Sequence, residues 1–339
     1  MTVRVGFLGA GLIATFHSKM LRASGEDVAW AGVWDPDEER RDRFAAASGA
    51  TPARSEEEVL ATCDAAYVCT WTSEHPRLVE AAVARGLPVF VEKPLATDLA
   101  GARAVADVVA RAGVTNQVGL ILRRAPVFTL LRALVAEAGP VMAVVFRDDQ
   151  FLPVQGSYGS TWRGDRERAG SGALLEHSIH DLDLLEHVVG PVASVSARSA
   201  HFHGLDGIED VVTASLALAG GGVASLTSVW HDVLSRPSLR RLEVFCTDRW
   251  FATDDDWFGP LTWQAPDGPA VTLAPDQVQD ELARRGLASP NPDGDFVRAV
   301  AEGRPAWPDV HVAVRAHELV DATYRSAAAA GAPVATAGA

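Results

Sequence analysis

A glycine-rich turn, GAGLIA at residues 9–14, constrains the fold more than any other part of this chain. A short β-branched run precedes the turn, and a helix pattern follows it. In such a G-x-G-x-x-A sequence, Gly9 permits a tight turn, Gly11 lets the backbone approach a pyrophosphate, and Ala14 allows close packing of helix on strand. The combination predicts a dinucleotide-binding unit.

The residues around this turn indicate which dinucleotide is bound. Leu12 and Ile13 open the helix, whose free N–H groups and positive dipole end favour a pyrophosphate. Asp35 ends the second strand pattern, where a ribose-binding acid is expected. Its carboxylate accepts hydrogen bonds from ribose hydroxyls and repels a 2′-phosphate, which favours NAD over NADP. Arg40 and Arg41 follow closely and leave NADP open as a second cofactor, although a charged, solvated helix face explains them equally well.

The first part of the chain alternates strand and helix patterns, which favours a parallel sheet covered on both faces. Strands are predicted at 3–8, 28–34, 65–70, 88–91 and 115–120, and helices at 12–23, 37–48, 76–85 and 99–112. We therefore expect an α/β fold with an N-terminal Rossmann domain, a doubly wound parallel sheet, over residues 1–122.

The pattern changes after about residue 123, where longer strand-like runs appear. Gly220-Gly221-Gly222 joins two of these runs as a hairpin turn. Residues 123–330 are expected to form an α/β domain with a large, mainly antiparallel open sheet, and residues 331–339 a flexible tail. Helices are predicted at 127–138, 294–302 and 310–326, and strands at 141–146, 192–203, 210–218, 223–231 and 240–246.

The composition excludes several classes of partner. A formal net charge of −14 disfavours nucleic acid, whose phosphates an acidic surface repels. No apolar run is long enough to span a membrane, and glycines interrupt the N-terminal one, so we expect neither a membrane partner nor a signal peptide. The 3 cysteines are too few for a disulfide framework. A cytoplasmic protein is predicted.

The segment Glu92-Lys93-Pro94 places a lysine at the carboxyl end of a parallel strand, where ligands bind in open α/β sheets. Burial and a positively charged nicotinamide lower the pKa of such a lysine, so that it can exchange a proton with an alcohol. A cis bond before Pro94 is an option that its turn context leaves open.

The segment GALLEHSIHDLD at residues 172–183 predicts an amphipathic helix that brings Glu176, His180, Asp183 and His187 onto one face. Taken by itself, this stripe could face water, carry acid–base chemistry or hold a metal. The metal alternative is weak, because His177 and His180 lack the H-E-x-x-H arrangement and no partner cluster appears elsewhere; we expect no metal.

Together these motifs resemble the Gfo/Idh/MocA oxidoreductase family. The resemblance extends over nearly the whole chain and rests on short motifs in a specific order: residues 9–14, 70–75, 92–94, 123–126, 162–163, the helix at 172–183 and 322–326.

The resemblance implies a set of functional residues. The family's Lys-Asp-His set corresponds to Lys93, Glu176 and His180, with glutamate where the family more often has aspartate. These three are the expected catalytic residues and, with Arg124, the expected substrate-binding residues. Asp183 matches a further acid that recurs after the histidine.

The remaining residues of the matching motifs are expected to bind the cofactor: Thr70, His75, Glu92, Trp162 and Arg163. His177 and His187 are left without a functional role.

The resemblance further implies an NAD-dependent oxidation of a secondary hydroxyl on a cyclic polyol or sugar, of the inositol- or sugar-dehydrogenase kind. It also implies a homodimer or homotetramer formed through the C-terminal sheet. Two alternatives stay open: an NAD-dependent glycosidase or sugar ketoreductase on the same scaffold, and a non-catalytic NAD(P)-binding sensor.

Overall fold

The computed structural model describes residues 1–156, 158–255 and 257–336, and the chain separates into two compact units. The first unit holds Met1–Ile121 and Pro290–Val314, and the second holds Leu122–Ser289 and the residues from Arg315 onward. Residues 290–314, which the sequence pattern leaves in the second domain, therefore pack with the first unit.

Within the described ranges, the strands of the first unit form a six-stranded sheet in the order β3-β2-β1-β4-β5-β6. Every pair in this sheet is parallel, as the alternating pattern predicts. The strands are β1 (Val3–Leu8), β2 (Val28–Trp34), β3 (Thr51–Pro52), β4 (Ala65–Val68), β5 (Val89–Val91) and β6 (Asn116–Val118).

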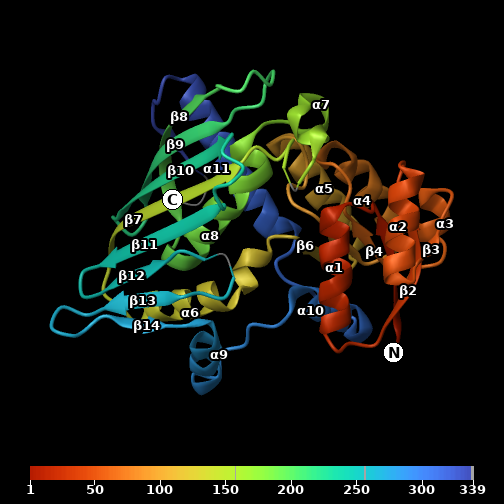
Figure 1. The fold of residues 1–339 in the computed structure, drawn as a ribbon, viewed down its shortest axis with the longest axis horizontal. Coiled ribbons are helices and arrows are strands. Elements are labelled where there is room, and N and C mark those ends of the chain that lie inside the picture. Colours follow the sequence, from red (N-terminus) through yellow and green to blue (C-terminus); the bar gives the residue numbers. More distant parts are fainter. Residues whose placement is uncertain (157, 256, 337–339) are drawn as a thin grey trace. The chain divides into compact units, whose positions relative to one another are not determined.

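Helices cover both faces of this parallel sheet, because its strands are apolar on both sides. Figure 1 shows α1 and α2 on one face and α4 and α5, drawn fainter, on the other. The helices are α1 (Leu12–Ala23), α2 (Glu38–Ser48), α3 (Glu56–Leu60), η1 (Thr72–Glu74), α4 (His75–Val83), α5 (Leu99–Ala112) and α10 (Pro292–Glu302).

An aromatic column forms the core of the first unit beneath α1 and α10. Phe7, Tyr67 and Phe90 stack with ring centroids 4.9 and 4.8 Å apart, and Phe296 of α10 meets Tyr67 edge-on at 5.6 Å. All four rings are buried. The returning segment thus supplies part of the hydrophobic core of the dinucleotide-binding unit.

The second unit is built on a nine-stranded sheet, counted over the described ranges, in the order β14-β13-β12-β11-β7-β10-β9-β8-β15. Its pairs are antiparallel except for β7 with β10, which confirms the mainly antiparallel prediction. The strands are β7 (Val141–Phe151), β8 (Val192–Ala200), β9 (Val211–Leu218), β10 (Val223–His231), β11 (Leu239–Cys246), β12 (Trp250–Thr253), β13 (Leu261–Gln264), β14 (Val271–Leu273) and β15 (Val334–Ala335).

Buried and exposed residues alternate along β9 and β10, so one face of this sheet is covered and the other is open. Figure 1 shows the strands side by side with α8 and α11 behind them. The predicted hairpin is present, since β9 and β10 pair across the glycine turn, in which Gly221 has a φ of +92°. The helices are η2 (Ile121–Arg124), α6 (Pro126–Ala136), η3 (Thr161–Gly164), α7 (Arg166–Ala169), η4 (Leu174–Ser178), α8 (Ile179–Val189), α9 (Pro275–Arg284) and α11 (Val310–Ala328), which begins in the first unit.

Part of the segment 331–339, which is predicted to be a flexible tail, forms a strand. Val334 and Ala335 form β15, which pairs with β8, and the Thr336 N–H donates to the Ala193 carbonyl oxygen at 3.0 Å. These bonds extend the sheet at its edge and hold the segment in place. The part of the prediction that concerns residues 337–339 lies outside the described residues.

None of the helices in the described ranges is both long enough and apolar enough to cross a lipid bilayer.

Candidate active site

The glycine-rich turn lies at the carboxyl end of β1 and has the shape that a dinucleotide requires. Gly9 has a φ of +97°, and a Cβ there would lie 2.5 Å from the Cys69 carbonyl oxygen, so only glycine fits. Gly11 is the N-cap of α1, and a Cβ there would meet nothing within 4 Å, which leaves its backbone open to a ligand. Ala14 is fully buried in the core. The turn therefore fits the expected pyrophosphate cradle.

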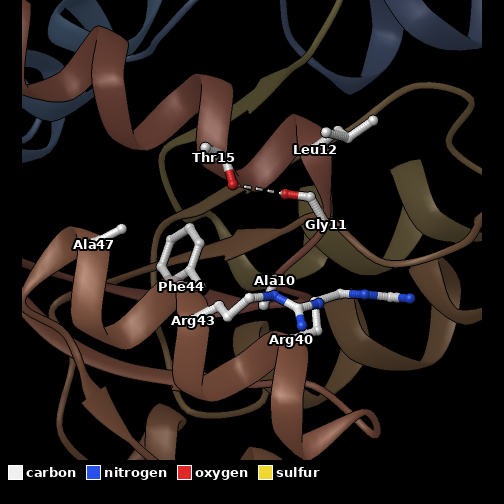
Figure 2. A pocket seen from close by; sticks show the side chains of 8 residues that line it. All are labelled: Ala10, Gly11, Leu12, Thr15, Arg40, Arg43, Phe44 and Ala47. Atoms are coloured by element: carbon white, nitrogen blue, oxygen red, sulfur yellow. Dashed lines mark hydrogen bonds between the residues drawn. The ribbon is translucent and has the colours of Figure 1, made fainter. Parts of the chain in front are cut away.

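A groove of about 250 Å³ opens beside this turn, between α1 and α2 (Figure 2). Leu12 is 58% exposed at its rim, whereas Ile13 packs against the core of the unit. The groove offers apolar and cationic walls, which suit an adenosine and its phosphates. Its lining residues are Ala10, Gly11, Leu12, Thr15, Arg40, Arg43, Phe44 and Ala47.

Asp35 joins the end of β2 to the glycine turn. Its Oδ2 accepts a hydrogen bond from the Ala10 N–H at 2.8 Å, and its Oδ1 accepts one from the Asp37 N–H at 2.9 Å. Each carboxylate oxygen retains a second lone pair for a ribose hydroxyl. The Arg40 guanidinium lies 3.9 Å from Asp35, which places a cation beside the acid that the sequence assigns to the ribose.

Lys93 lies at the carboxyl end of β5, in the turn Glu92-Lys93-Pro94, which His75 contacts through its side chain. The Lys93–Pro94 bond is cis. Nδ1 of the buried His75 lies 2.7 Å from the Pro94 carbonyl oxygen, and its Nε2 lies 3.2 Å from the Thr70 carbonyl oxygen. Of the two predicted cofactor residues, His75 thus contacts the turn that carries Lys93, and its ring links this turn to the Thr70 backbone.

Glu92 does not present its carboxylate to the surface of the first unit, because it is buried against His17. His17 Nε2 lies 2.8 Å from Glu92 Oε1, and its Nδ1 lies 2.8 Å from Asp293 Oδ1. Burial opposes protonation of His17, but Asp293 and Glu92 raise its pKa to about 10, so the ring is an imidazolium at neutral pH. Sequence reasoning missed His17 and Asp293, which lie far apart in the chain.

In the second unit, the predicted functional helix begins as a π-helix. Leu174–Ser178 form η4, which continues into α8 at Ile179. The wider turn breaks the 3.6-residue spacing from which a common face for Glu176 and His180 was predicted. Glu176 and Asp183 are buried, so the alternative of a polar stripe facing water is excluded.

Glu176 pairs with one of the predicted cofactor residues. Arg163 Nε donates to Glu176 Oε2 at 3.1 Å, and the same guanidinium lies over the Trp162 ring at 4.5 Å. His180 lies in the first turn of α8 and is partly exposed. Four predicted site residues of the second unit thus come from η3, η4 and α8.

Asp183 forms a two-bonded ion pair with Arg123, at 2.7 Å on each oxygen. Burial raises the pKa of Asp183 to about 6, against the opposing effect of Arg123. His187 lies 3.1 Å from the same guanidinium, and burial together with that charge lowers its pKa to about 3. Asp183 is thus buried and held by Arg123 within the second unit. The predicted substrate residue Arg124 is half-buried in η2.

His177, to which the sequence assigns no role, belongs to a polar cluster with Asp148, Asp181 and Arg240. Its Nε2 lies 2.7 Å from Asp148, and Arg240 bridges Asp148 at 3.1 Å and Asp181 at 2.6 Å. Burial raises the pKa of Asp181 to about 6, with Asp148 adding to the rise and Arg240 opposing it. A signal for this cluster exists in the sequence, since Arg240 shares the inward parity of Leu242 in its strand.

A buried acid that sequence reasoning also missed anchors the start of η4. Glu209 accepts hydrogen bonds from the Gly172 N–H at 2.7 Å, the Leu174 N–H at 2.9 Å and the Tyr324 hydroxyl at 2.8 Å. A Cβ on Gly172 would lie 1.8 Å from the Glu209 carbonyl oxygen. The carboxylate thus satisfies N–H groups that would otherwise be unpaired at this helix end.

The predicted site residues therefore fall into two sets. The first unit brings together the dinucleotide turn, Asp35, His75, Glu92 and Lys93, and the second brings together Trp162, Arg163, Glu176 and His180. Within the described ranges, no group of three or more His, Cys, Asp or Glu side chains is arranged so that it could hold a metal ion.

Two models of one protein family match the chain. The model described as "Oxidoreductase family, NAD-binding Rossmann fold" matches residues 3–120, and the model described as "GFO/IDH/MocA C-terminal domain" matches residues 128–252.

Curated relatives match at moderate identity. A 1,5-anhydro-D-fructose reductase of Ensifer adhaerens is 31% identical over 242 residues, which cover 68% of this chain and 69% of the relative. An inositol 2-dehydrogenase of Cereibacter sphaeroides is 40% identical over 111 residues, and this match spans only about a third of either chain. Among solved structures, a levoglucosan dehydrogenase in complex with NADH and levoglucosan matches 99% of both chains with a TM-score of 0.87 at 20% identity. This last likeness is one of fold.

Proposed function

This chain belongs to the Gfo/Idh/MocA family of oxidoreductases with an NAD-binding Rossmann domain, and we propose that it reversibly oxidises a secondary hydroxyl of a cyclic polyol or sugar. The substrate class is supported by the names of its relatives, an inositol dehydrogenase and an anhydrosugar reductase. Both names denote ring compounds that carry several hydroxyl groups.

The observation that carries the proposal is the arrangement at the carboxyl edge of the first sheet. The glycine turn follows β1, Asp35 follows β2 and Lys93 follows β5, in a sheet whose strands are all parallel. Open α/β sheets bind ligands at this edge. A proton-transferring lysine and a dinucleotide cradle on one edge fit a dehydrogenase.

Each residue then has a chemical role. NAD, when bound, supplies a hydride acceptor. The backbone N–H groups at Gly11 bind the pyrophosphate, and Asp35 accepts bonds from the ribose. Lys93 takes the proton of the substrate hydroxyl, and Glu176 and His180 orient the diol through hydrogen bonds. Arg163 fixes the Glu176 carboxylate for this purpose through the bond described above.

A screen of polyols and sugars for NADH formation, run in parallel with NADP, tests the substrate class. Lys93→Ala should lower kcat by about two orders of magnitude or more, the range typical of general acid–base residues. The chain offers a matched control, because Lys19 is its only other lysine and is exposed on α1. Turnover of Lys93→Ala at the rate of Lys19→Ala would reject the assignment of Lys93.

The reverse reaction, reduction of a sugar ketone, is the second candidate. The observation that favours it is the match to the 1,5-anhydro-D-fructose reductase. Oxidation of NADH by keto sugars, measured in the same screen, separates the two directions.

The open face of the second sheet is the proposed oligomer interface. Val145 of β7 and Val223 of β10 are 45% and 56% exposed on it, so apolar side chains lie open on two neighbouring strands. We propose a homodimer or homotetramer formed through this face, to be tested by light scattering of wild type and of a Val145→Glu variant, which should dissociate. We also propose a cytoplasmic location, testable by cell fractionation.

A further inference from the structure

A buried cation of the first unit has no role in the scheme above. His17 lies on α1, the helix that the dinucleotide turn opens, and its side chain is fully buried. A charged imidazolium in such a place costs free energy unless it is paired on every side. The residues that pair with His17 therefore indicate which segments this side chain holds in position.

The two ring nitrogens of His17 contact two different segments. Nδ1 meets Asp293 at the start of α10, and Nε2 meets Glu92 at the end of β5, each at 2.8 Å. The ring also lies edge-on to Phe90 with centroids 4.7 Å apart, so it cannot move without repacking the aromatic column.

Glu92, which His17 holds in place, in turn contacts the backbone of Lys93. Its second oxygen, Oε2, accepts a hydrogen bond from the Lys93 N–H at 3.2 Å. Behind it stands Gly119, where a Cβ would lie 2.2 Å from Glu92 Oε1, so the carboxylate fills the space that the missing side chain leaves.

The charge of His17 also determines the charge of Glu92. Burial alone would raise the pKa of Glu92, but the hydrogen bond and charge of His17 lower it, helped by Lys93 and His75. Two further groups face this cluster, Tyr67 from β4 and Cys69 directly after it: burial raises the pKa values of both well above their usual range, so both are neutral.

From this geometry we infer that His17 is a positioning residue for Lys93: it keeps Glu92 ionised and fixed, and Glu92 in turn sets the orientation and the proton affinity of the lysine. The inference rests on the proposed function of Lys93. Because His17 lies on the helix that begins at the coenzyme turn, it links the coenzyme-binding turn to Lys93 within the first unit.

The direction of the effect follows from electrostatics. An ionised Glu92 stabilises the protonated form of its neighbour Lys93. In His17→Gln the carboxylate loses its cation and takes up a proton in its buried site, and in Glu92→Gln the charge is absent. Either change removes a negative neighbour, so Lys93 should lose its proton at lower pH.

The pair of lysines makes this effect directly measurable. Reductive methylation with isotope-labelled formaldehyde gives NMR signals from Lys93, Lys19 and the N-terminus only, because the chain has no other lysine. We expect the titration midpoint of Lys93 to fall in His17→Gln and Glu92→Gln, while that of Lys19 stays constant. His311→Gln, an exposed histidine of the same unit, should change neither.

A double-mutant cycle on kcat separates positioning from simple structural support. Each single variant should lower kcat by about tenfold, and the double variant should be no slower than the slower single variant, because both changes break one chain of contacts. Phe296→Leu, which loosens the same aromatic core but leaves His17, Glu92 and Asp293 in place, should lower Tm and leave the Lys93 midpoint unchanged.

Unchanged Lys93 midpoints in both variants, or kcat losses that multiply in the double variant, would overturn the inference. If His17→Gln does not fold, Glu92→Gln alone decides, since it must reproduce the shift. A Lys93→Ala variant with wild-type kcat would instead reject the proposed function, while the midpoint measurement would still report on the link from His17 to Lys93.

Discussion

Replacement of Arg240 by methionine tests whether charge stabilises the polar cluster of Asp148, His177, Asp181 and Arg240. The Arg240 side chain is 3% exposed and bridges Asp148 and Asp181. Methionine has a similar length and no charge, so the change removes the cation and leaves two buried carboxylates close together.

Removing one member of a buried ion pair costs about 3–5 kcal/mol, because the remaining charge stays desolvated. His177 still pairs with Asp148 at 2.7 Å, so we expect the lower end of this range, about 3 kcal/mol. For a unit of roughly 200 residues such a loss lowers Tm by about 6–12 °C.

The loss of unfolding free energy in Arg240→Met should depend on pH, and its direction can be predicted. Without the guanidinium, the folded-state pKa of Asp181 rises further above its unfolded value of about 3.9. The ionised acid then destabilises the fold at high pH, and stability returns as pH falls through the folded pKa. The deficit of Arg240→Met should therefore be smaller at about pH 5 than at about pH 8.

The assay is calorimetric unfolding of wild type, Arg240→Met and Arg241→Met across that pH range. Arg241 is the matched control, because it is the next residue of the same strand and its side chain is 47% exposed. Its loss should stay within about 0.5 kcal/mol. Equal losses for the two variants, or a deficit that grows toward low pH, would refute the reasoning.

Three further predictions follow from contacts described above. Gly172→Ala should destabilise by about 1–3 kcal/mol or more, because its Cβ would meet the Glu209 backbone, whereas Gly220→Ala, which meets nothing within 4 Å, should be close to neutral in thermal melts. In the folded unit, Asp293 and Glu92 raise the pKa of His17 to about 10. Its contribution to the free energy of unfolding should therefore be complete below the unfolded pKa of about 6.5 and be lost as pH rises toward 10, which denaturant titrations at several pH values will measure. Asp35→Asn removes the charge that repels a 2′-phosphate, so the ratio of kcat/KM with NADP to that with NAD should rise by about tenfold, and an unchanged ratio would contradict the ribose assignment.

Local sequence patterns were sufficient to predict the bounds of elements where a strand and a helix follow each other closely. The bounds of β1, α1, β2 and α5 agree with the predicted ranges, because apolar periodicity and the caps Asp98 and Gly113 act within one element. The short elements α3, β12, β13 and β14 were not predicted. Segments of three to five residues with Pro, Asp and Gly around them carry too little periodicity to be distinguished from loop.

The site was harder to predict wherever it depends on contacts between distant residues. Lys93 and the glycine turn can be identified from short sequence motifs. The contacts of His17 with Glu92 and Asp293, in contrast, form only in the folded unit. The common face predicted for Glu176 and His180 assumed a regular α-helix, and the π-helix at Leu174–Ser178 removes that assumption. No periodicity in the sequence signals such a turn.

The return of Pro290–Val314 to the first unit sets the order in which the chain can fold during synthesis. Chains generally fold from the N-terminus as they leave the ribosome. Here the nascent dinucleotide-binding segment emerges without Phe296 in its core and without Asp293 as the partner of His17. One side of its aromatic core stays uncovered until residues 290–314 have been synthesised. A shortened gene ending after residue 121 should accordingly yield an aggregation-prone product rather than a small coenzyme-binding protein.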